Sequence, residues 1–342
     1  MPRNRMSDDS KFLVITSIAS PNEVLKSYAR ECPVHGFEFL LIGDAKSPPD
    51  FQLPGCDFWS LQSQENLDFE IRKTLPAGHY ARKNLGYLLA AARGAKIIVE
   101  TDDDNLPLDG FWHQRASTAT AIPVLDTGWV NVYRHFTGIR IWPRGYPLEQ
   151  LQHPIQPIDA EPESVNCPIQ QGLADENPDV DAVYRLTLPL PVYFDASQKP
   201  LALGRGAWSP FNSQNTTWFR EAFPLMYLPS HCSFRMTDIW RSYIAQRLAW
   251  ECGWSVLYHA PTVYQKRNEH NLIRDFEEEI PGYLQNARIA DMLAKLDLKE
   301  GIENVLDNLL KAYSLLCRSG IIGPQEMELV EAWCRDCKNL GF

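Results

Sequence analysis

Three consecutive aspartates, Asp102, Asp103 and Asp104, are the residues whose types and spacing most directly indicate chemistry. They follow an apolar segment, residues 95–100, that is expected to form a buried strand. Side chains alternate along a strand, so Asp102 and Asp104 are expected to point one way and Asp103 the other. Two carboxylates on one side suit a hard divalent cation such as Mg²⁺ or Mn²⁺, which takes further ligands from water and substrate phosphates. The alternative is a solvated acidic turn.

A second candidate is the start of a helix expected over residues 81–93. Arg82 and Lys83 lie in its first turn, where positive side chains oppose the helix dipole. An anion docked at this helix end would account for them, because free backbone N–H groups point there, and Asn84 would add a hydrogen bond. The alternative is a pair of ordinary surface cations.

A third candidate is Asp238, at the start of a helix expected over residues 238–251. Arg235 and Arg241 are expected to hold its carboxylate ionised, which suits a base that takes a proton from a hydroxyl group. The alternative is a plain N-cap, which needs no further function.

An α/β frame would bring these residues together. Short apolar segments over residues 12–18, 37–42 and 95–100 have the length and β-branched content of buried strands. Amphipathic helices are expected between them, over residues 21–31 and 81–93. This alternation predicts a parallel α/β sheet, which places chemistry at the carboxyl ends of its strands.

The middle of the chain is less regular. Residues 107–200 are rich in Pro, Trp and Tyr and predict a loop-rich insertion. Further strands are expected near residues 56–61, 129–133, 183–188, 211–219 and 256–264.

The last part of the chain is predicted to contain only α-helices. Apolar residues at helical spacing from Ile302 to Leu316 predict one helix, and Pro324 begins another. We therefore predict a disordered polar tail over residues 1–11, one α/β domain over residues 12–285 and an all-α C-terminal extension over residues 286–342.

Composition excludes some classes of function. The 342 residues contain 33 Lys and Arg against 43 Asp and Glu, a net charge of −10, which argues against a nucleic-acid partner but allows a single nucleotide. The longest apolar run, residues 85–92, is too short for a membrane span, and the polar N-terminus has no signal core. The eight cysteines have no framework spacing, which indicates reduced thiols in a cytoplasmic protein.

Several motifs together resemble known glycosyltransferases. Asn-Leu-Gly-Tyr-Leu at residues 84–88 and Glu-Thr-Asp-Asp-Asp-Asn at residues 100–105 are similar to the GT-A enzymes, whose Asp-x-Asp binds a metal and a nucleotide-sugar diphosphate. The chain also resembles the STELLO-type glycosyltransferase-like family over residues 12–285, and the helical tail is unmatched. The segments that carry this resemblance are residues 141–148, 170–173, 179–186 and 237–241 with Gln246-Arg247.

A more distant likeness is to the reversibly glycosylated polypeptides, which are UDP-arabinose mutases. The shared features are the helix at residues 84–88, the triple Asp and the Asp-x-Asp-Ala segment at residues 179–182. Leu85 stands where that family tends to have an aromatic residue.

The resemblance implies a GT-A-like nucleotide-sugar-binding domain with a mixed, mainly parallel sheet. It implies that Asp102 and Asp104 bind Mn²⁺ or Mg²⁺, that Asp103 lies near the donor sugar or ribose, and that Asp238 is the general base. The remaining residues expected to bind the nucleotide sugar are Thr16, Ser17, Ile18, Ala19, Asp44, Arg82, Lys83, Asn84, Asp181 and Arg185, the last two on the sugar or acceptor side.

This sequence differs from the families that it resembles in two respects. GT-A enzymes often supply a C-terminal histidine to the metal, whereas the corresponding strand end here carries Gln265. His270 is expected to complete the metal site, with His259, Gln265 or water as alternatives. The plant STELLO proteins are anchored in the Golgi by a membrane span, and this sequence is expected to be a cytoplasmic relative without an integral membrane segment.

The resulting hypothesis is a metal-dependent enzyme of polysaccharide biosynthesis. It would transfer a hexose or pentose from a nucleotide sugar, with UDP favoured, to a glycan or other hydroxyl acceptor, with inversion favoured. One alternative is a UDP-sugar mutase of the reversibly glycosylated polypeptide type. Another is a non-catalytic GT-A-like binding or scaffold subunit, which an exposed apolar stripe over residues 302–316 would favour. The C-terminal helices also allow a homo-oligomer.

Overall fold

The computed structural model describes residues 10–154, 158, 160–267 and 271–342. Within these residues, eleven strands form one sheet and two more form a separate pair. The strands of the large sheet are β1 (Lys11–Thr16), β2 (Phe37–Ile42), β3 (Asp57–Trp59), β4 (Ile97–Thr101), β5 (Asn105–Pro107), β6 (Thr118–Val124), β8 (Glu163–Asn166), β9 (Ile169–Asp175), β10 (Leu201–Leu203), β12 (Asn215–Phe219) and β13 (Val256–Gln265). The separate pair is β7 (Gly128–Trp129) and β11 (Ala207–Trp208).

Helices follow and separate these strands. The α-helices are α1 (Glu23–Val34), α2 (Leu61–Gln64), α3 (Lys83–Ala92), α4 (Val132–His135), α5 (Ala182–Thr187), α6 (Thr237–Glu251), α7 (Leu272–Ala294), α8 (Val305–Arg318) and α9 (Glu326–Asn339). The 3₁₀ helices are η1 (Ile71–Lys73), η2 (Tyr80–Arg82), η3 (Asp109–Trp112), η4 (Leu148–Gln152), η5 (Arg220–Met226), η6 (Phe234–Met236) and η7 (Ile302–Asn304).

The large sheet has the order β3-β2-β1-β4-β12-β9-β13-β10-β6-β8, with β5 beside β13. The first four strands of this order pair in parallel, and β12 runs antiparallel to both of its neighbours. Parallel pairing returns between β9 and β13 and between β6 and β10. The expected α/β class, with a mixed, mainly parallel sheet and C-terminal helices, is confirmed and is consistent with a GT-A-like fold.

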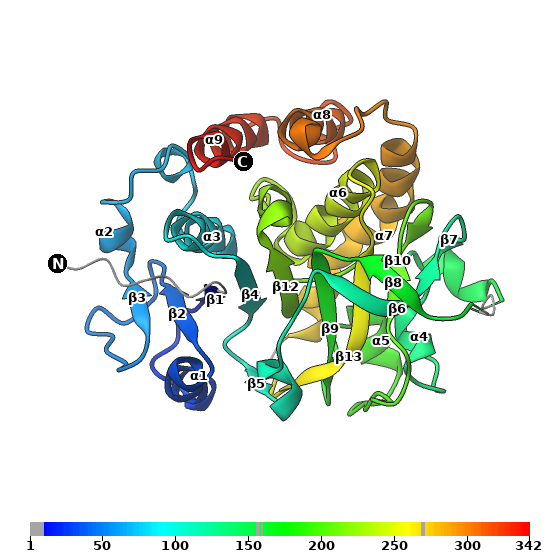
Figure 1. Cartoon of the computed structure of the whole chain (residues 1–342), viewed down its shortest axis with the longest axis horizontal. Coiled ribbons are helices and arrows are strands. Elements are labelled where there is room, and N and C mark those ends of the chain that lie inside the picture. The colour runs from blue at the N-terminus through cyan, green and yellow to red at the C-terminus, as the bar shows by residue number, and fades with distance from the viewer. Residues whose placement is uncertain (1–9, 155–157, 159, 268–270) are drawn as a thin grey trace.

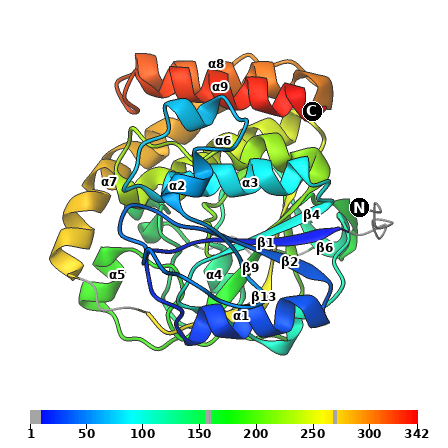
Figure 2. The same cartoon turned by 90° about the vertical axis from the view of Figure 1, so that its left-hand side faces the viewer.

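Both faces of the sheet are covered near β1. Phe12 and Val14 belong to the apolar core under α3, while Leu13 and Ile15 belong to the core under α1. This alternation explains why β1 is a continuous apolar run, since a parallel strand covered by helices on both sides has no polar face. Figures 1 and 2 show α1 on one side of the sheet and α3 and α6 on the other.

Gly86 lets α3 lie close to the sheet. A Cβ atom at this position would come within 2.6 Å of Val14 Cγ1 and 2.9 Å of Ile42 Cγ1. The glycine in the sequence motif at residues 84–88 therefore has a packing role, and it fixes the distance between α3 and the strands beside the acidic triad.

The C-terminal helices form an outer layer over α3 and α6 (Figure 2). Leu309, Tyr313 and Leu316 of α8 are buried, so most of the apolar stripe expected over residues 302–316 faces the protein; Ile302, 48% exposed, does not. In α9, Asp336 accepts hydrogen bonds from the backbone N–H groups of Glu70 and Ile71 at 2.8 and 3.0 Å. The exposed stripe that would favour a scaffold subunit is therefore not present.

Several sequence expectations differ from the structure. The strand expected near residues 183–188 is the helix α5, because Asp181 caps it through the Tyr184 N–H at 2.8 Å and α5 packs on α7. The strand expected near residues 129–133 is divided between β7 and α4. Residues 107–200 also supply β9 to the middle of the sheet, and the boundary expected at residue 285 falls inside α7.

All eight cysteines are free, as expected. Of the predicted disordered tail, residues 1–9 lie outside the described residues, and β1 begins at Lys11.

Candidate functional site

The acidic triad lies at the carboxyl end of β4. This strand pairs in parallel with β1, so the triad adjoins the loop that follows β1. The strand ends at Thr101, and Asp102–Asp104 form a turn in which the Asn105 N–H donates to the Asp102 carbonyl at 3.3 Å. The expected strand-like alternation of the three carboxylates is therefore wrong, because the chain has already left the sheet.

Asp102 faces the start of α3. Its Oδ1 pairs with Lys83 Nζ at 3.1 Å, and the same ammonium group donates to the Thr101 carbonyl at 3.0 Å. The Lys83 side chain is fully buried, whereas 41% of the Asp102 side chain is exposed. Lys83 therefore holds the turn from inside and leaves part of the Asp102 carboxylate accessible.

The other two aspartates contact different elements. Asp103 accepts a short hydrogen bond from the Ser17 hydroxyl, and its carbonyl accepts from Asn22 Nδ2 at 2.8 Å. Asp104 Oδ2 accepts from Gln265 Nε2 at 3.0 Å. The turn thus joins the loop after β1, the start of α3 and the end of β13.

The electrostatics of the turn favour a bound cation. Burial raises the pKa of Asp102 above its ordinary value, and the charge of Asp104 adds to the increase, while Lys83 opposes it. Burial also raises the pKa values of Asp103 and Asp104. Since a raised carboxyl pKa means that the charged form lacks compensation, a divalent cation would stabilise this cluster.

Three buried oxygens at or next to the triad lack hydrogen-bond partners among the described residues. They are Asp104 Oδ1, Asn105 Oδ1 and Gln265 Oε1. Asn105 and Gln265 are partners in the register of β5 and β13, so their side chains belong to one local region. Carboxylate and amide oxygens are the ligands that Mg²⁺ and Mn²⁺ accept.

Histidine ligands find less support. His270, expected to complete the metal site, lies outside the described residues. His259 Nδ1 lies 2.9 Å from the Ala260 carbonyl, and burial lowers its pKa to about 4. In the part of the chain that the structure describes, no group of three or more His, Cys, Asp and Glu side chains has the arrangement of a metal site.

The expected anion site at the start of α3 has internal partners instead. Arg82 Nε donates to Gln64 Oε1 at 2.7 Å, and its Nη1 donates to the Leu75 carbonyl. Asn84 exchanges two hydrogen bonds with the backbone of Leu228, each at 2.9 Å. The alternative of ordinary surface cations is wrong, because Arg82 and Lys83 are buried. Together with Asn84, they hold the start of α3 in place.

The loops after β1 and β2 meet beside the triad. Ser17 Oγ also accepts from the Ala19 N–H at 3.0 Å, and the Ser17 carbonyl accepts from Ser47 Oγ at 2.8 Å. Ile18, which lies between Ser17 and Ala19, is 52% exposed. Thr16, which precedes this loop, is the last residue of β1.

Asp44, after β2, accepts hydrogen bonds from the Gly78 and His79 N–H groups at 2.8 and 2.9 Å. These contacts connect the loop after β2 to the segment that leads into α3. The residues expected at the nucleoside side therefore share the edge of the sheet where the triad lies.

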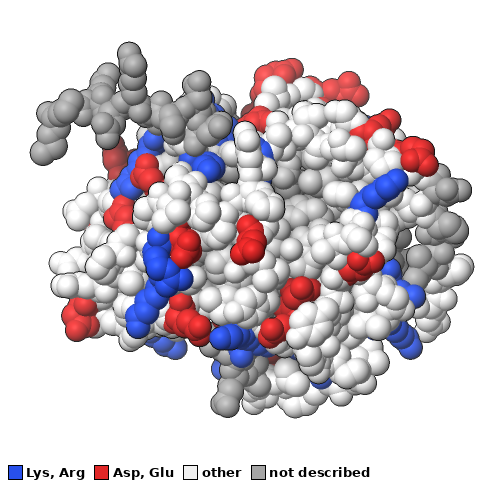
Figure 3. Space-filling view, turned by 60° about the horizontal axis from the view of Figure 1, so that its bottom comes forward, with Lys and Arg blue, Asp and Glu red and all other residues white. Residues whose placement is uncertain are grey.

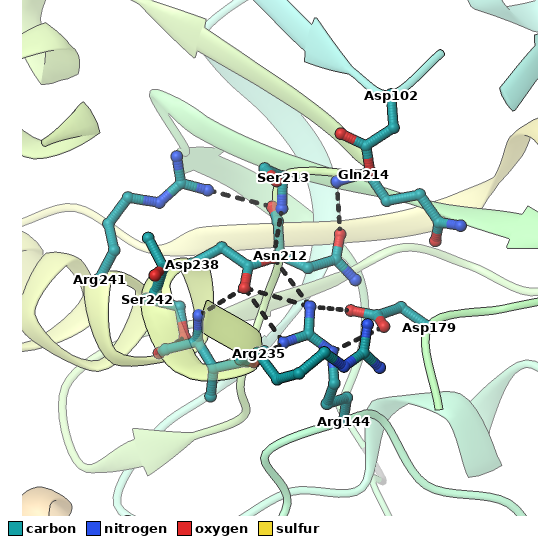
Figure 4. Close-up of polar contacts among 12 residues, drawn as sticks. Asp102, Arg144, Asp179, Asn212, Ser213, Gln214, Arg235, Asp238, Arg241 and Ser242 are labelled. Atoms are coloured by element: carbon teal, nitrogen blue, oxygen red, sulfur yellow. Dashed lines mark hydrogen bonds and ion pairs between the residues drawn. The ribbon is translucent and has the colours of Figure 1, made fainter. Parts of the chain in front are cut away.

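Asp238 lies in a buried network of charges (Figure 4). Its carboxylate pairs with Arg144 Nη2 at 2.9 Å and accepts from the Ser213 N–H at 3.1 Å and the Ile239 N–H at 3.0 Å. Although burial opposes ionisation, Arg144 outweighs it and the pKa of Asp238 falls below its ordinary value. Asp238 is therefore ionised, and both of its oxygens already have donors.

The ion-pair partner of Asp238 differs from those expected, although the charge of Arg241 also lowers the pKa of Asp238, as expected. Arg144, rather than Arg235 or Arg241, forms its ion pair, and Arg144 also binds Asp179 in a bidentate pair at 2.8 and 2.9 Å. Arg235 instead pairs with Glu279 at 2.7 Å. The plain N-cap alternative is also wrong, because Asp238 is inside the first turn of α6.

Arg241 links the segment 212–214 to β4. Its guanidinium pairs with the fully buried Glu100 at 2.8 Å and donates to the Asn212 carbonyl at 3.2 Å. The Gln214 carbonyl accepts from the Thr101 hydroxyl at 2.7 Å. The segment 212–214 is thus bonded both to Asp238 and to the strand end that carries the triad (Figure 4).

Asp181 and Arg185, expected on the sugar or acceptor side, have structural contacts. Asp181 is fully buried, caps α5 and accepts from Trp142 Nε1 at 2.6 Å. Burial raises its pKa to about 7. Arg185 donates to the carbonyls of Pro178 and Val180 at 2.8 and 3.3 Å.

The sequence reasoning missed Arg144 and Glu100 as parts of the site. Arg144 lies within the motif at residues 141–148, so a cation in an otherwise apolar and aromatic segment was the available signal. Nothing in the local sequence pairs it with Asp238, 94 residues away. Glu100 gave a weaker signal, as an acid at the end of an apolar strand.

In the described part of the chain, no helix has both the length and the apolar character needed to cross a membrane.

Comparisons with known proteins identify similar sequences. The probable glycosyltransferase STELLO2 of Arabidopsis thaliana is 30% identical over 353 residues, which cover 97% of this chain and 45% of the plant protein. The probable glycosyltransferase STELLO1 of the same plant is 29% identical over 353 residues, which again cover 97% of this chain and 45% of the plant protein. The chain thus spans a little under half the length of these relatives.

The model of the STELLO glycosyltransferase family matches residues 235–342. This match corrects the expectation that the resemblance ends at residue 285, because it includes α8 and α9 completely. The family sequence thus includes the outer helical layer as well as α6, which carries Asp238. Along nearly its whole length, this chain is similar in sequence to the STELLO glycosyltransferases.

Proposed function

We propose that this protein is a metal-dependent glycosyltransferase that moves a sugar from a nucleotide sugar, with UDP favoured, to a hydroxyl acceptor. The observation that carries the proposal is a set of buried oxygens that have no donor among the described residues: Asp104 Oδ1, Asn105 Oδ1 and Gln265 Oε1. The partly accessible Asp102 is next to them. The sequence similarity to proteins named as probable glycosyltransferases supports the same reaction class.

Asp102 and Asp104 would hold Mn²⁺ or Mg²⁺, with Gln265 at the same strand end. The cation would neutralise charge that develops on the diphosphate as it leaves the sugar. Ser17 fixes Asp103 toward the loop after β1, where we place the ribose and base. Lys83 balances part of the triad charge from inside the protein, so the turn keeps its shape before the nucleotide arrives.

Asp238 is the carboxylate to which we assign the acceptor proton, with inversion at the sugar. Arg144 keeps it ionised, and the segment 212–214 links it to the strand that carries the triad. To receive a proton, Asp238 needs the acceptor hydroxyl to replace one of its present donors. Binding of the acceptor would therefore loosen the contact with Arg144 or Ser213.

Calorimetric titration with UDP-glucose and other UDP-sugars, with and without Mn²⁺, tests the metal and donor assignment. Asp102→Ala and Asp104→Ala are each expected to abolish the Mn²⁺-dependent part of binding. Asp307→Ala, at an exposed aspartate of the outer helix α8, is the matched control and is expected to bind as the unaltered protein does. Unchanged binding in both triad variants would reject the metal site.

A further inference from the structure

A cavity lies away from the acidic triad. It has a volume of about 840 Å³ and is bordered by β6, β7, α4 and the segment that follows α4. In the strand order, β6 is five positions beyond β4, which corresponds to roughly 24 Å at the usual spacing between strands. These elements lie at the right-hand side of Figure 1, across the sheet from β1 and β2.

Aromatic side chains form part of the cavity wall. Trp129 is half-buried, and its ring meets that of Tyr146 edge-on with centroids 5.9 Å apart. Trp142 also lines the cavity and is held by its hydrogen bond to Asp181. Such fixed rings offer apolar faces against which the C–H groups of a sugar ring can pack with little loss of side-chain entropy.

The charge of the cavity is opposite to that of the whole chain. Its described lining includes Arg134 and Arg140 together with two histidines, and no Asp or Glu among the described residues belongs to it, although the chain has a net charge of −10. Arg140 is exposed and forms no ion pair with any described residue. Arg134 donates to the Ile139 carbonyl, but its buried Nε has no partner within the described chain. The cavity therefore presents cationic groups that no carboxylate of the described chain neutralises.

Polar groups suited to hydroxyls lie beside these cations. The side chains of Thr127, Gln150 and His153 line the cavity and have no hydrogen-bond partner in the portion that the structure describes. Together they supply donors and acceptors, whereas a phosphate or a simple anion would need donors only. This mixture fits a ligand with several hydroxyl groups and a negative charge.

We propose that this cavity binds an acidic oligosaccharide, a chain of sugar rings that carry carboxylates. Arg134 and Arg140 would pair with the carboxylates, Gln150 and Thr127 would bond hydroxyl groups, and Trp129 would pack on a ring face. The volume lies within the range of natural small-ligand sites. The site is separate from the proposed transfer site and does not depend on the reaction assigned there.

Calorimetric titration with α-1,4-linked trigalacturonic acid tests the proposal, with neutral cellotriose and UMP as comparison ligands. Trigalacturonic acid is expected to bind, and Arg134→Gln and Arg140→Gln are each expected to weaken binding by about tenfold, since each removes a hydrogen bond to a charged group. Arg288→Gln, an exposed arginine of α7 that contacts only Gln285 by its side chain among the described residues, is the matched control. The triad variant Asp102→Ala is expected to bind normally, because the sites are distinct.

Tryptophan fluorescence gives an independent readout. Binding is expected to change the emission of the unaltered protein. In Trp129→Phe this change is expected to be smaller while the protein remains folded, because Trp142 also lines the cavity. Three results would each overturn the proposal: no binding of trigalacturonic acid, equal binding of cellotriose, or competition by UMP. Undiminished binding in both Arg134→Gln and Arg140→Gln would overturn it as well.

Discussion

Single residues around the triad are arranged so that charge is compensated unevenly. Lys83 neutralises one oxygen of Asp102 from inside the protein, whereas Asp104 keeps an oxygen with no donor among the described residues. Arg144 serves both Asp179 and Asp238, so one guanidinium balances two carboxylates. The carboxylates with the fewest donors are those that we assign to the cation, and the best-paired carboxylate is the one that we assign to the acceptor.

The role of Asp238 can be separated from its structural contacts. Asp238→Asn is expected to leave donor binding near normal and to reduce sugar transfer by about 10²–10⁴, the usual contribution of acid–base catalysis. Transfer is measured with a UDP-sugar and a panel of hydroxyl acceptors, and circular dichroism confirms the fold.

Asp179→Asn is the matched control, because it removes the other carboxylate that Arg144 binds. A smaller loss of transfer in this variant is expected. Equal losses in the two variants would mean that Asp238 only positions Arg144, and full activity of Asp238→Asn would remove it from the reaction altogether.

Elements are held beside the site by capping contacts as well as by packing. His79 is the N-cap of η2, which leads directly into α3, and its Nδ1 accepts from the Ala81 N–H at 3.0 Å. Farther out, Asp336 of α9 caps η1 in the same way, and Trp333 donates to the Pro224 carbonyl at 3.0 Å. The outer helices therefore support the segment that leads into α3.

The cap of η2 predicts a dependence of stability on pH. Burial lowers the pKa of His79 from 6.5 to about 4, with His231 adding to the shift and Asp44 opposing it. Folding thus keeps the His79 ring neutral. The contribution of this neutral ring to the free energy of unfolding is complete above pH 6.5 and is lost as the pH falls toward 4. His79→Asn keeps a capping acceptor without titrating, and it is expected to lose less unfolding free energy between pH 7 and 5.

Urea unfolding at the two pH values measures that difference. His153→Asn, at an exposed histidine, is expected to behave as the unaltered protein does. The same loss of stability in His79→Asn and in the unaltered protein would contradict the prediction.

The outer helical layer is expected to be part of the fold rather than an addition to it. Trp333 is 1% exposed and lies among Tyr227, Tyr313 and Pro224. Trp333→Ala is expected to lower the free energy of unfolding by about 3–5 kcal/mol, because a large buried side chain is lost and a cavity remains. Denaturant titration measures this loss, and Leu284→Ala, at a leucine that is 70% exposed, is expected to change little. A change below 1 kcal/mol for Trp333→Ala would show that the layer is only loosely attached.

At the scale of the whole molecule, the relevant feature is the net negative charge of the chain. The face in Figure 3 shows acidic and basic side chains interspersed over a largely uncharged surface. A net charge of −10 disfavours the binding of polyanions. A single site such as the cationic cavity can still bind a small anion.

A bound nucleotide sugar is expected to stabilise the whole chain. A ligand at 100 times its dissociation constant adds about 2.7 kcal/mol, which corresponds to a rise of roughly 3–5 °C in the unfolding temperature of a chain of this size. Differential scanning fluorimetry with UDP-sugars is expected to show this rise with Mn²⁺ and a smaller one without it. No rise with any nucleotide sugar, with or without Mn²⁺, would contradict the proposed donor class.

Much of the frame followed from local sequence patterns. The segment at residues 37–42 is a strand with the expected bounds, and α6 and β13 begin within one residue of expectation, because burial on both faces or along one stripe leaves a clear apolar period. The segments at residues 129–133 and 183–188 were misread, since short elements are decided by caps and by packing against α7.

The sequence by itself determined that Asp102, Asp103 and Asp104 follow a buried strand, because residue type and apolar pattern are local properties. Only the tertiary structure decided which groups meet them: Lys83, Ser17 and Gln265 come from three separate elements. It also decided that Arg144, and neither arginine nearest in sequence, pairs with Asp238. Charge pairing depends on distance in space, which the order of residues does not state, and a buried carboxylate takes whichever cation the packing brings into contact with it.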